Sequence, residues 1–112
     1  MSPRVQARLW AAQRISAMAL AICVLVHLVT LIYAVHGGLS AAEILARTRG
    51  DWLWGAFYAV FVVAVSVHAP IGLRAILNEW LAWRGRSLDA IVLVVAVVLA
   101  LLGLRAVWAV VA

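Results

Sequence analysis

The sequence contains three long stretches of predominantly apolar residues, at about 15–35, 54–73 and 88–108. Each stretch is long enough to cross the hydrocarbon core of a bilayer as a helix, which takes about 20 residues. We therefore predict an all-α membrane protein with three transmembrane helices in a single domain, residues 1–112. The composition agrees with this class, because 69% of the residues are hydrophobic whereas about half are apolar in a soluble domain.

The arginines predict the orientation in the membrane. All nine basic residues are arginines and they border the apolar stretches, so lipid headgroups explain them better than nucleic acid does. Six of them flank the N-terminus and the second loop, whereas only two lie in the first loop. The six arginines at the N-terminus and the second loop are Arg4, Arg8, Arg14, Arg74, Arg84 and Arg86. The positive-inside rule then predicts a cytoplasmic N-terminus and a cytoplasmic 75–87 loop. We expect a multi-pass protein of a bacterial-type inner membrane.

The first loop carries a helix-start signal. Ser40 precedes Glu43 by three residues, which fits a capping box. A short surface helix over residues 41–47 is one interpretation, and a simple turn is the other.

His68 interrupts the second apolar stretch. An ionisable side chain at membrane depth is costly and indicates a function, and a neutral imidazole is well suited to ligate haem iron. Gly72 lies one helical turn further on and leaves space for a flat cofactor. Arg74 follows where the apolar run ends, within reach of a carboxylate. This pattern predicts His68 as a haem axial ligand, with Gly72 and Arg74 beside the cofactor or its propionate. A packing histidine bonded to a carbonyl is the alternative.

His27 lies near the middle of the first apolar stretch, where a ligand and a packing histidine are both open interpretations. The presence of His68 in a neighbouring helix favours the ligand. A rise of 1.5 Å per residue separates the two histidines by about 8 Å in depth, whereas two axial ligands of one haem lie at nearly equal depth. We therefore expect two different haems, each completed by another chain. We expect His36, at the outer surface, to be solvated or to cap a helix.

A second group of polar residues lies at the membrane edges. Arg14 and Ser16 stand at the cytoplasmic entrance of the first stretch. A guanidinium and a hydroxyl there can hydrogen-bond a quinone carbonyl, and Trp10, one turn earlier, can pack against the ring. The alternative is an arginine that snorkels to headgroups and fixes the topology. Arg105, in the outer half of the third stretch, is predicted either to reach a haem propionate or to snorkel outward.

Two segments resemble one family. The run 13–17 (Gln-Arg-Ile-Ser-Ala) resembles the His-Arg-x-Ser-Gly entrance of the cytochrome b membrane anchors of succinate dehydrogenase and fumarate reductase. The run 68–74 (His-Ala-Pro-Ile-Gly-Leu-Arg), with Glu79 further on, resembles their His-x-x-x-Gly-x-Arg-His-x-x-x-Asp segment. Three spans in a chain of this length also match, so the resemblance covers nearly the whole sequence.

The resemblance implies a haem b ligand at the position of His68 and a quinone contact at the position of Arg14. The chain departs from the family pattern in three places: Gln13 replaces the entrance histidine, Trp10 stands where a quinone-binding serine is often found, and Ala75 replaces the second histidine. His27 looks like the first-helix ligand of the two-haem anchors, so the chain resembles one half of such an anchor.

These observations predict a membrane anchor and cytochrome b subunit that passes electrons between an iron–sulfur subunit and quinone. As an anchor, the chain is expected to be a non-catalytic subunit. The expected partners are flavoprotein and iron–sulfur subunits on the cytoplasmic side, together with a second membrane anchor subunit or a second copy of this chain. Two alternatives stay open: a cytochrome b subunit of another membrane oxidoreductase, and a haem-free structural membrane subunit.

Overall fold

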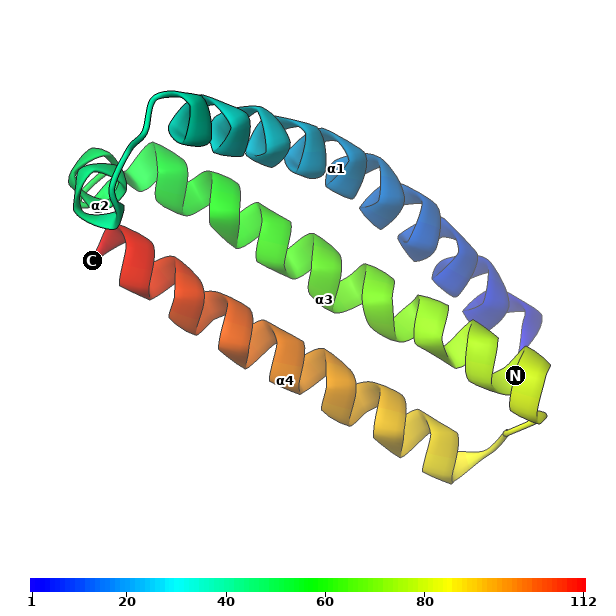
Figure 1. The fold of residues 1–112 in the computed structure, drawn as a ribbon. Helices are drawn as coiled ribbons and strands as arrows, with labels where there is room; N and C mark the ends of the chain where they lie inside the picture. Colours follow the sequence, from blue (N-terminus) through cyan, green and yellow to red (C-terminus); the bar gives the residue numbers. More distant parts are fainter.

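The computed structural model describes all 112 residues and consists of four helices: α1 (Pro3–His36), α2 (Ala41–Thr48), α3 (Trp52–Leu81) and α4 (Arg86–Val111). By length and composition, α1, α3 and α4 can each cross a membrane. The predicted all-α membrane fold with three spans is therefore confirmed. Figure 1 shows α3 between α1 and α4, with short α2 lying across the end that also holds the C-terminus.

The membrane-spanning helices are longer than the apolar stretches from which they were predicted. The largest difference is in α1, which begins at Pro3 rather than near residue 15. Ser2 caps this start, because its hydroxyl accepts a hydrogen bond from the backbone N–H of Val5 at 3.3 Å, and Pro3 occupies the first turn. Hydropathy marks only the part of a helix that lies in lipid, so α1 projects about 18 Å beyond the predicted span.

Capping also sets the ends of α3. The Asp51 carboxylate accepts hydrogen bonds from the backbone N–H groups of Leu53 and Trp54 at 3.0 and 3.3 Å, which starts the helix. Ala82 adopts a left-handed conformation with φ 52° and ends it. Pro70 lies inside α3 and has no N–H to donate to the preceding turn.

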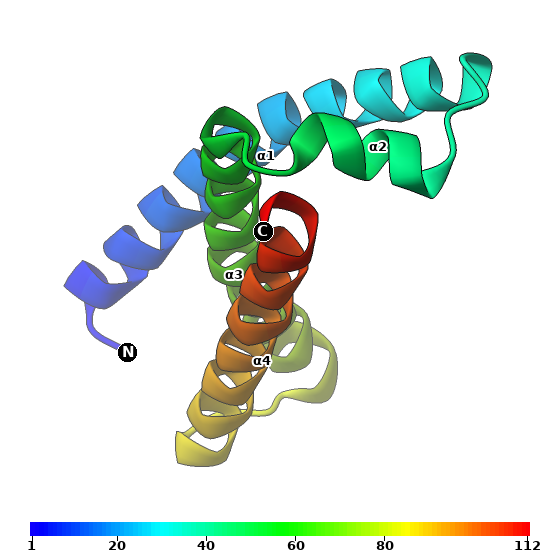
Figure 2. The same ribbon diagram turned by 90° about the vertical axis from the view of Figure 1, so that its left-hand side faces the viewer.

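Helix α3 is the centre of the packing, because it contacts both α1 and α4, whereas α1 and α4 form no comparable interface. Figure 2 shows α4 running alongside α3 while α1 crosses the pair obliquely. Helices α3 and α4 approach each other closely at Gly103, where an added Cβ atom would stand 2.6 Å from Cγ1 of Val62. A small residue is therefore required there for the two backbones to approach.

The first loop closes the end of the bundle that is the outer end in the predicted orientation. The predicted N-cap at Ser40 is present, since its hydroxyl accepts from the Glu43 N–H at 3.2 Å and α2 follows over Ala41–Thr48. The capping box is only half formed, because the Glu43 carboxylate accepts from the Ser40 hydroxyl at 3.0 Å rather than from the Ser40 backbone N–H. Thr48 then donates its hydroxyl proton to the carbonyl oxygen of Val110 at 2.8 Å, and the Gly50 N–H donates to that of Val111 at 2.8 Å. The loop thus satisfies carbonyl groups that the C-terminus of α4 leaves free.

Most of the apolar surface is not covered by the chain itself. Only 8 of 112 residues are buried, and the large hydrophobic side chains of the three spans are mainly exposed. Lipid or other membrane subunits must cover this surface, because apolar area of this extent is unfavourable in water. The single cysteine, Cys23, is buried and free, in agreement with the absence of any possible internal disulfide.

Candidate functional site

His68 lies in the interface between α3 and α1. Its Nδ1 atom is 3.3 Å from the hydroxyl oxygen of Ser16, which is only 5% exposed. The same Ser16 hydroxyl donates a hydrogen bond to the carbonyl oxygen of Gln13 at 3.0 Å. The Nε2 atom of His68 has no hydrogen-bond partner within the chain. His68 therefore presents one engaged and one free ring nitrogen, which is the donor chemistry that an axial haem ligand needs.

Gly72 faces the same helix as His68. A Cβ atom added at Gly72 would meet only the Nε2 atom of Gln13, at 3.4 Å. The Oε1 atom of Gln13 is buried and has no hydrogen-bond partner. Near His68, Gly72 thus leaves space between α1 and α3, and Gln13 Oε1 is left without a hydrogen-bond donor. Both features fit a cofactor bound beside these two helices.

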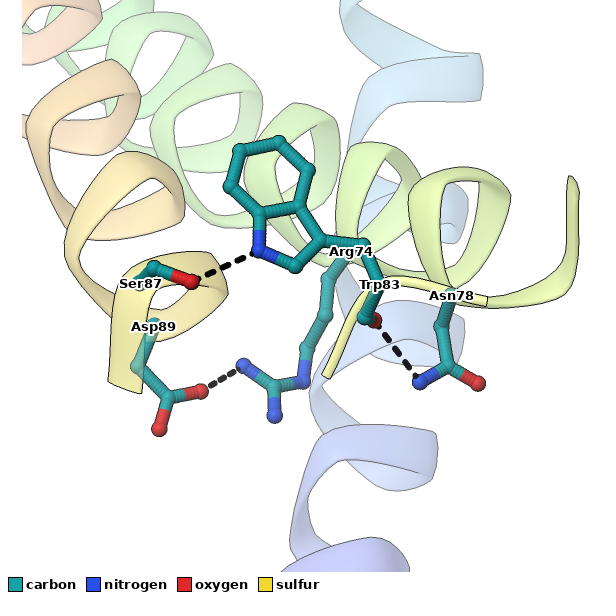
Figure 3. A network of polar contacts seen from close by, with 5 residues as sticks. All are labelled: Arg74, Asn78, Trp83, Ser87 and Asp89. Atoms are coloured by element: carbon teal, nitrogen blue, oxygen red, sulfur yellow. Dashed lines mark hydrogen bonds and ion pairs between the residues drawn. The ribbon is translucent and has the colours of Figure 1, made fainter. Parts of the chain in front are cut away.

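Arg74 does not lie free beside His68. Its guanidinium forms an ion pair with Asp89 at the start of α4, and its side chain is 21% exposed. Figure 3 shows this pair within a polar network that joins α3 to α4. In the network, Asn78 donates to the carbonyl oxygen of Trp83 at 3.2 Å, and the Trp83 indole donates to the Ser87 hydroxyl at 2.7 Å. The carboxylate within reach of Arg74 is therefore Asp89, and a propionate would have to share the guanidinium with it.

The three residues predicted to contact quinone lie on two faces of α1. The Arg14 guanidinium lies over the Trp10 ring, 5.1 Å from its centroid, and both side chains are exposed. Ser16 points about 200° away around the helix axis, toward His68. The structure thus brings Arg14 and Trp10 together but separates Ser16 from them. Sequence proximity had grouped the three because helical periodicity alone does not say which face meets α3.

A hollow of about 360 Å³ lies beside Trp10 at the N-terminal end of the molecule, and Arg14 is not among its lining residues. Its walls come from the first turns of α1 and the last turns of α3, and they include Trp10, Gln13, Arg74 and Glu79. A flat ligand packed against Trp10 would have the side chains of Gln13 from α1 and of Arg74 and Glu79 from α3 within reach. By the extent of the apolar stretches, this hollow lies beside the ends of two predicted spans.

His27 occupies a separate site nearer the outer end. Its Nδ1 atom is 3.4 Å from the Tyr58 hydroxyl, and its ring makes edge-to-face contacts with Tyr58 and Phe61, with centroids 5.8 and 5.7 Å away. No local pattern in the sequence indicates these partners, because the pairing depends on the register of α1 against α3. His27 also lines a largely apolar groove of about 750 Å³, which α2 covers and which includes Arg47.

The helix register separates the two membrane histidines more than the sequence suggested. His68 lies level with Ser16, whereas His27 lies level with Tyr58. The stretch of α3 from Tyr58 to His68 corresponds to about 15 Å of helix rise, compared with the 8 Å expected from the apolar stretches. The 8 Å estimate took the outer ends of the two apolar stretches, residues 35 and 54, as level, whereas the pairing of His27 with Tyr58 shifts α1 along α3.

Two further residues lie at the outer end. Arg105 is exposed on α4 and forms no hydrogen bond or ion pair within the chain, so the propionate and snorkelling alternatives both remain predictions. His36 is exposed in the last turn of α1, as expected for a solvated histidine.

The fold and this site define a three-span α-helical membrane protein with histidines between its helices and an arginine–tryptophan pair at one membrane edge. The family model for the succinate dehydrogenase/fumarate reductase transmembrane subunit matches residues 1–104. The chain belongs to this family, as the resemblance of its two motifs predicted. No curated protein and no solved structure matches the chain.

Proposed function

We propose that the chain is the cytochrome b membrane anchor of a succinate dehydrogenase or fumarate reductase complex. In this role it holds haem b through His68 and carries electrons between the iron–sulfur subunit and quinone. The observation that carries the proposal is the environment of His68, whose Nδ1 is held by buried Ser16 while its Nε2 stays free. The family membership of residues 1–104 supports the same role.

His68 would hold the iron from α3, and Gly72 would leave space for the edge of the ring one turn away. Bound haem b supplies a one-electron redox centre within the membrane. The chain offers no second histidine at the level of His68, since His27 lies about 15 Å away by helix rise. A second membrane anchor subunit or a second copy of this chain must therefore supply the opposite axial ligand.

Quinone is the substrate that fits the Arg14–Trp10 pair. The guanidinium of Arg14 would donate a hydrogen bond to a quinone carbonyl oxygen and stabilise negative charge on it. The Trp10 ring would pack against the quinone ring, and the adjoining hollow of about 360 Å³ would receive part of the head group. Ser16 takes no part in this contact in our proposal, because its hydroxyl is bonded to Gln13 and His68.

The N-terminal end of the molecule is the proposed docking face for the flavoprotein and iron–sulfur subunits. The N-terminus and the α3–α4 connection lie at this end (Figure 1). The arginine bias supports a cytoplasmic position for it in a bacterial-type cell. The projecting first turns of α1, which carry Arg4 and Arg8, extend beyond the membrane toward such partners.

Haem content of the purified complex tests the proposal. The complex with the wild-type chain should show a b-type reduced α-band and a matching haem yield in the pyridine-haemochrome assay. The His68→Ala complex should lack the haem that His68 holds, and with it that part of the band and of the yield. His36→Ala is the matched control, because His36 is exposed and should leave the haem unchanged. Co-purification of the partner subunits establishes that the His68 variant still assembles. An unchanged haem content in an assembled His68→Ala complex would refute the proposal, and a wild-type complex without haem would identify a haem-free anchor.

A further inference from the structure

Ser16 has one hydroxyl proton and two neighbouring acceptors, and the shorter of the two contacts is the one within α1. The Ser16 oxygen is 3.0 Å from the carbonyl oxygen of Gln13, three residues earlier in α1, and a carbonyl oxygen can only accept. The hydroxyl proton is therefore donated within α1. The oxygen keeps its lone pairs for a second partner, and that partner is Nδ1 of His68 at 3.3 Å.

The donor in the second contact must then be the histidine ring. With the Ser16 proton already engaged, a hydrogen bond between Oγ and Nδ1 requires the proton to be on Nδ1. In a neutral imidazole the other nitrogen, Nε2, then carries the lone pair. Ser16 is 5% exposed and lies in a span, so competition from water is weak and this tautomer is strongly favoured.

We infer that Ser16 is the positioning residue of the haem ligand: it accepts the Nδ1 proton of His68 and thereby directs the Nε2 lone pair at the iron. The inference rests on the proposed haem function. A histidine ligand generally donates its second ring N–H to such an acceptor, which fixes the ring orientation and increases the basicity of the ligating nitrogen. Here a hydroxyl on the neighbouring helix α1 supplies the acceptor, so the packing of α1 on α3 itself prepares the ligand.

His27 provides an internal comparison. Its Nδ1 atom is 3.4 Å from the Tyr58 hydroxyl, and that hydroxyl makes no other hydrogen bond in the chain. The Tyr58 proton is therefore free to point either at His27 or away from it, and neither tautomer of His27 is imposed. The two membrane histidines differ in this respect, and only His68 is committed to one free ring nitrogen before a metal arrives.

The first test needs no haem. The chain is labelled with ¹⁵N-histidine, reconstituted without haem and studied by NMR. The His68 ring signals, assigned by their loss in His68→Gln, should show the proton on Nδ1. Ser16→Ala removes the acceptor and should shift His68 toward the Nε2–H tautomer, whereas Ser16→Thr keeps a hydroxyl and should restore the wild-type pattern. Ser66→Ala is the matched control, because Ser66 is also a serine within a span but its hydroxyl has no partner. A His68 tautomer that is the same in wild type and Ser16→Ala would overturn the inference.

The second test uses the assembled complex with haem. Ser16→Ala should weaken haem retention about 10- to 100-fold, the usual effect of losing an outer-shell partner, and should move the reduction potential to more positive values, because a less basic ligand stabilises ferric iron less. Ser16→Thr and Ser66→Ala should resemble wild type.

The two hypotheses fail in different ways. If haem is lost in His68→Ala but its retention and potential are unchanged in Ser16→Ala, the proposed function stands and the positioning role is wrong. If the wild-type complex holds no haem at all, the proposed function fails, and the positioning role in haem binding fails with it, even where the Nδ1–H tautomer is observed.

Discussion

Neighbouring residues of α1 serve different purposes because a helix turns them to different sides. Arg14 and Ser16 are two positions apart and point about 200° away from each other. Arg14 meets Trp10 at the exposed face, 5.1 Å from the ring centroid, while Ser16 meets His68 in the interface with α3. In the proposed function, one turn of helix therefore carries both a contact for quinone and a contact for the haem ligand.

This division predicts separable defects. Arg14→Leu should reduce quinone reduction about 10- to 100-fold, because it removes a charge-assisted hydrogen bond of about 1.5–3 kcal/mol, and leave succinate oxidation by an artificial acceptor nearly intact. Arg49→Leu is the control, since Arg49 is an exposed arginine without an aromatic partner and lies away from the proposed docking face. Equal loss of both activities would mean failed assembly and would return Arg14 to the role of a topology anchor.

At the level of single residues, the sequence indicates which side chains matter but not which ones meet. His68 stands out because an ionisable group in an apolar run needs an explanation. Its pairing with Ser16 depends on the register and crossing of two helices far apart in the chain, and no local pattern encodes that register. For the same reason the ion pair of Arg74 with Asp89 was not predicted, although the need of Arg74 for a carboxylate was.

The helices show the complementary case, in which the sequence predicts the membrane part well and the ends less well. All three predicted spans lie inside α1, α3 and α4, because the bilayer requires long apolar segments. The ends depend on caps such as Ser2 and Asp51, which act outside the apolar stretches. The N-cap of α2 was predicted because Ser40 and Glu43 are close together in the sequence.

The packing of α3 on α4 yields a prediction for Gly103. Gly103→Ala should lower the free energy of unfolding in detergent by about 1–3 kcal/mol, as expected for overpacking, because the new Cβ would lie 2.6 Å from the Val62 side chain. Chemical denaturation followed by circular dichroism measures the change.

A double-mutant cycle with Val62 identifies the cause of this effect. In a Val62→Ala background the cost of Gly103→Ala should shrink, because the Val62 Cγ atoms that it contacts are absent. Ala109→Leu, on an exposed part of α4, is the control and should leave stability nearly unchanged. An equal cost in both backgrounds would show that Gly103 acts through something other than the contact with Val62.

At the scale of the whole molecule, the helices form an open arrangement rather than a closed bundle. Helix α3 packs against both other spans, whereas α1 and α4 leave a groove of about 750 Å³ between them near the outer end. His27 lies on this groove, while His68 lies toward the opposite end, level with Ser16. With so few buried residues, a chain of this shape is expected to complete its membrane surface with another subunit.

This arrangement leads to the prediction that His27 and His68 bind different haems, each completed by a ligand from a second chain. The two rings are about 15 Å apart along the helices at 1.5 Å per residue, whereas the two axial ligands of one haem lie on opposite sides of a single iron. The purified complex should therefore contain two haems, and His27→Ala and His68→Ala should each remove a spectrally distinct one.

Tyr58→Phe keeps the aromatic contact with His27 but removes its only side-chain hydrogen-bond partner, so it should perturb only the His27 haem. A single haem lost equally in both histidine variants would contradict the prediction, and a His27→Ala complex with unchanged haem would make His27 a packing residue against Tyr58 and Phe61.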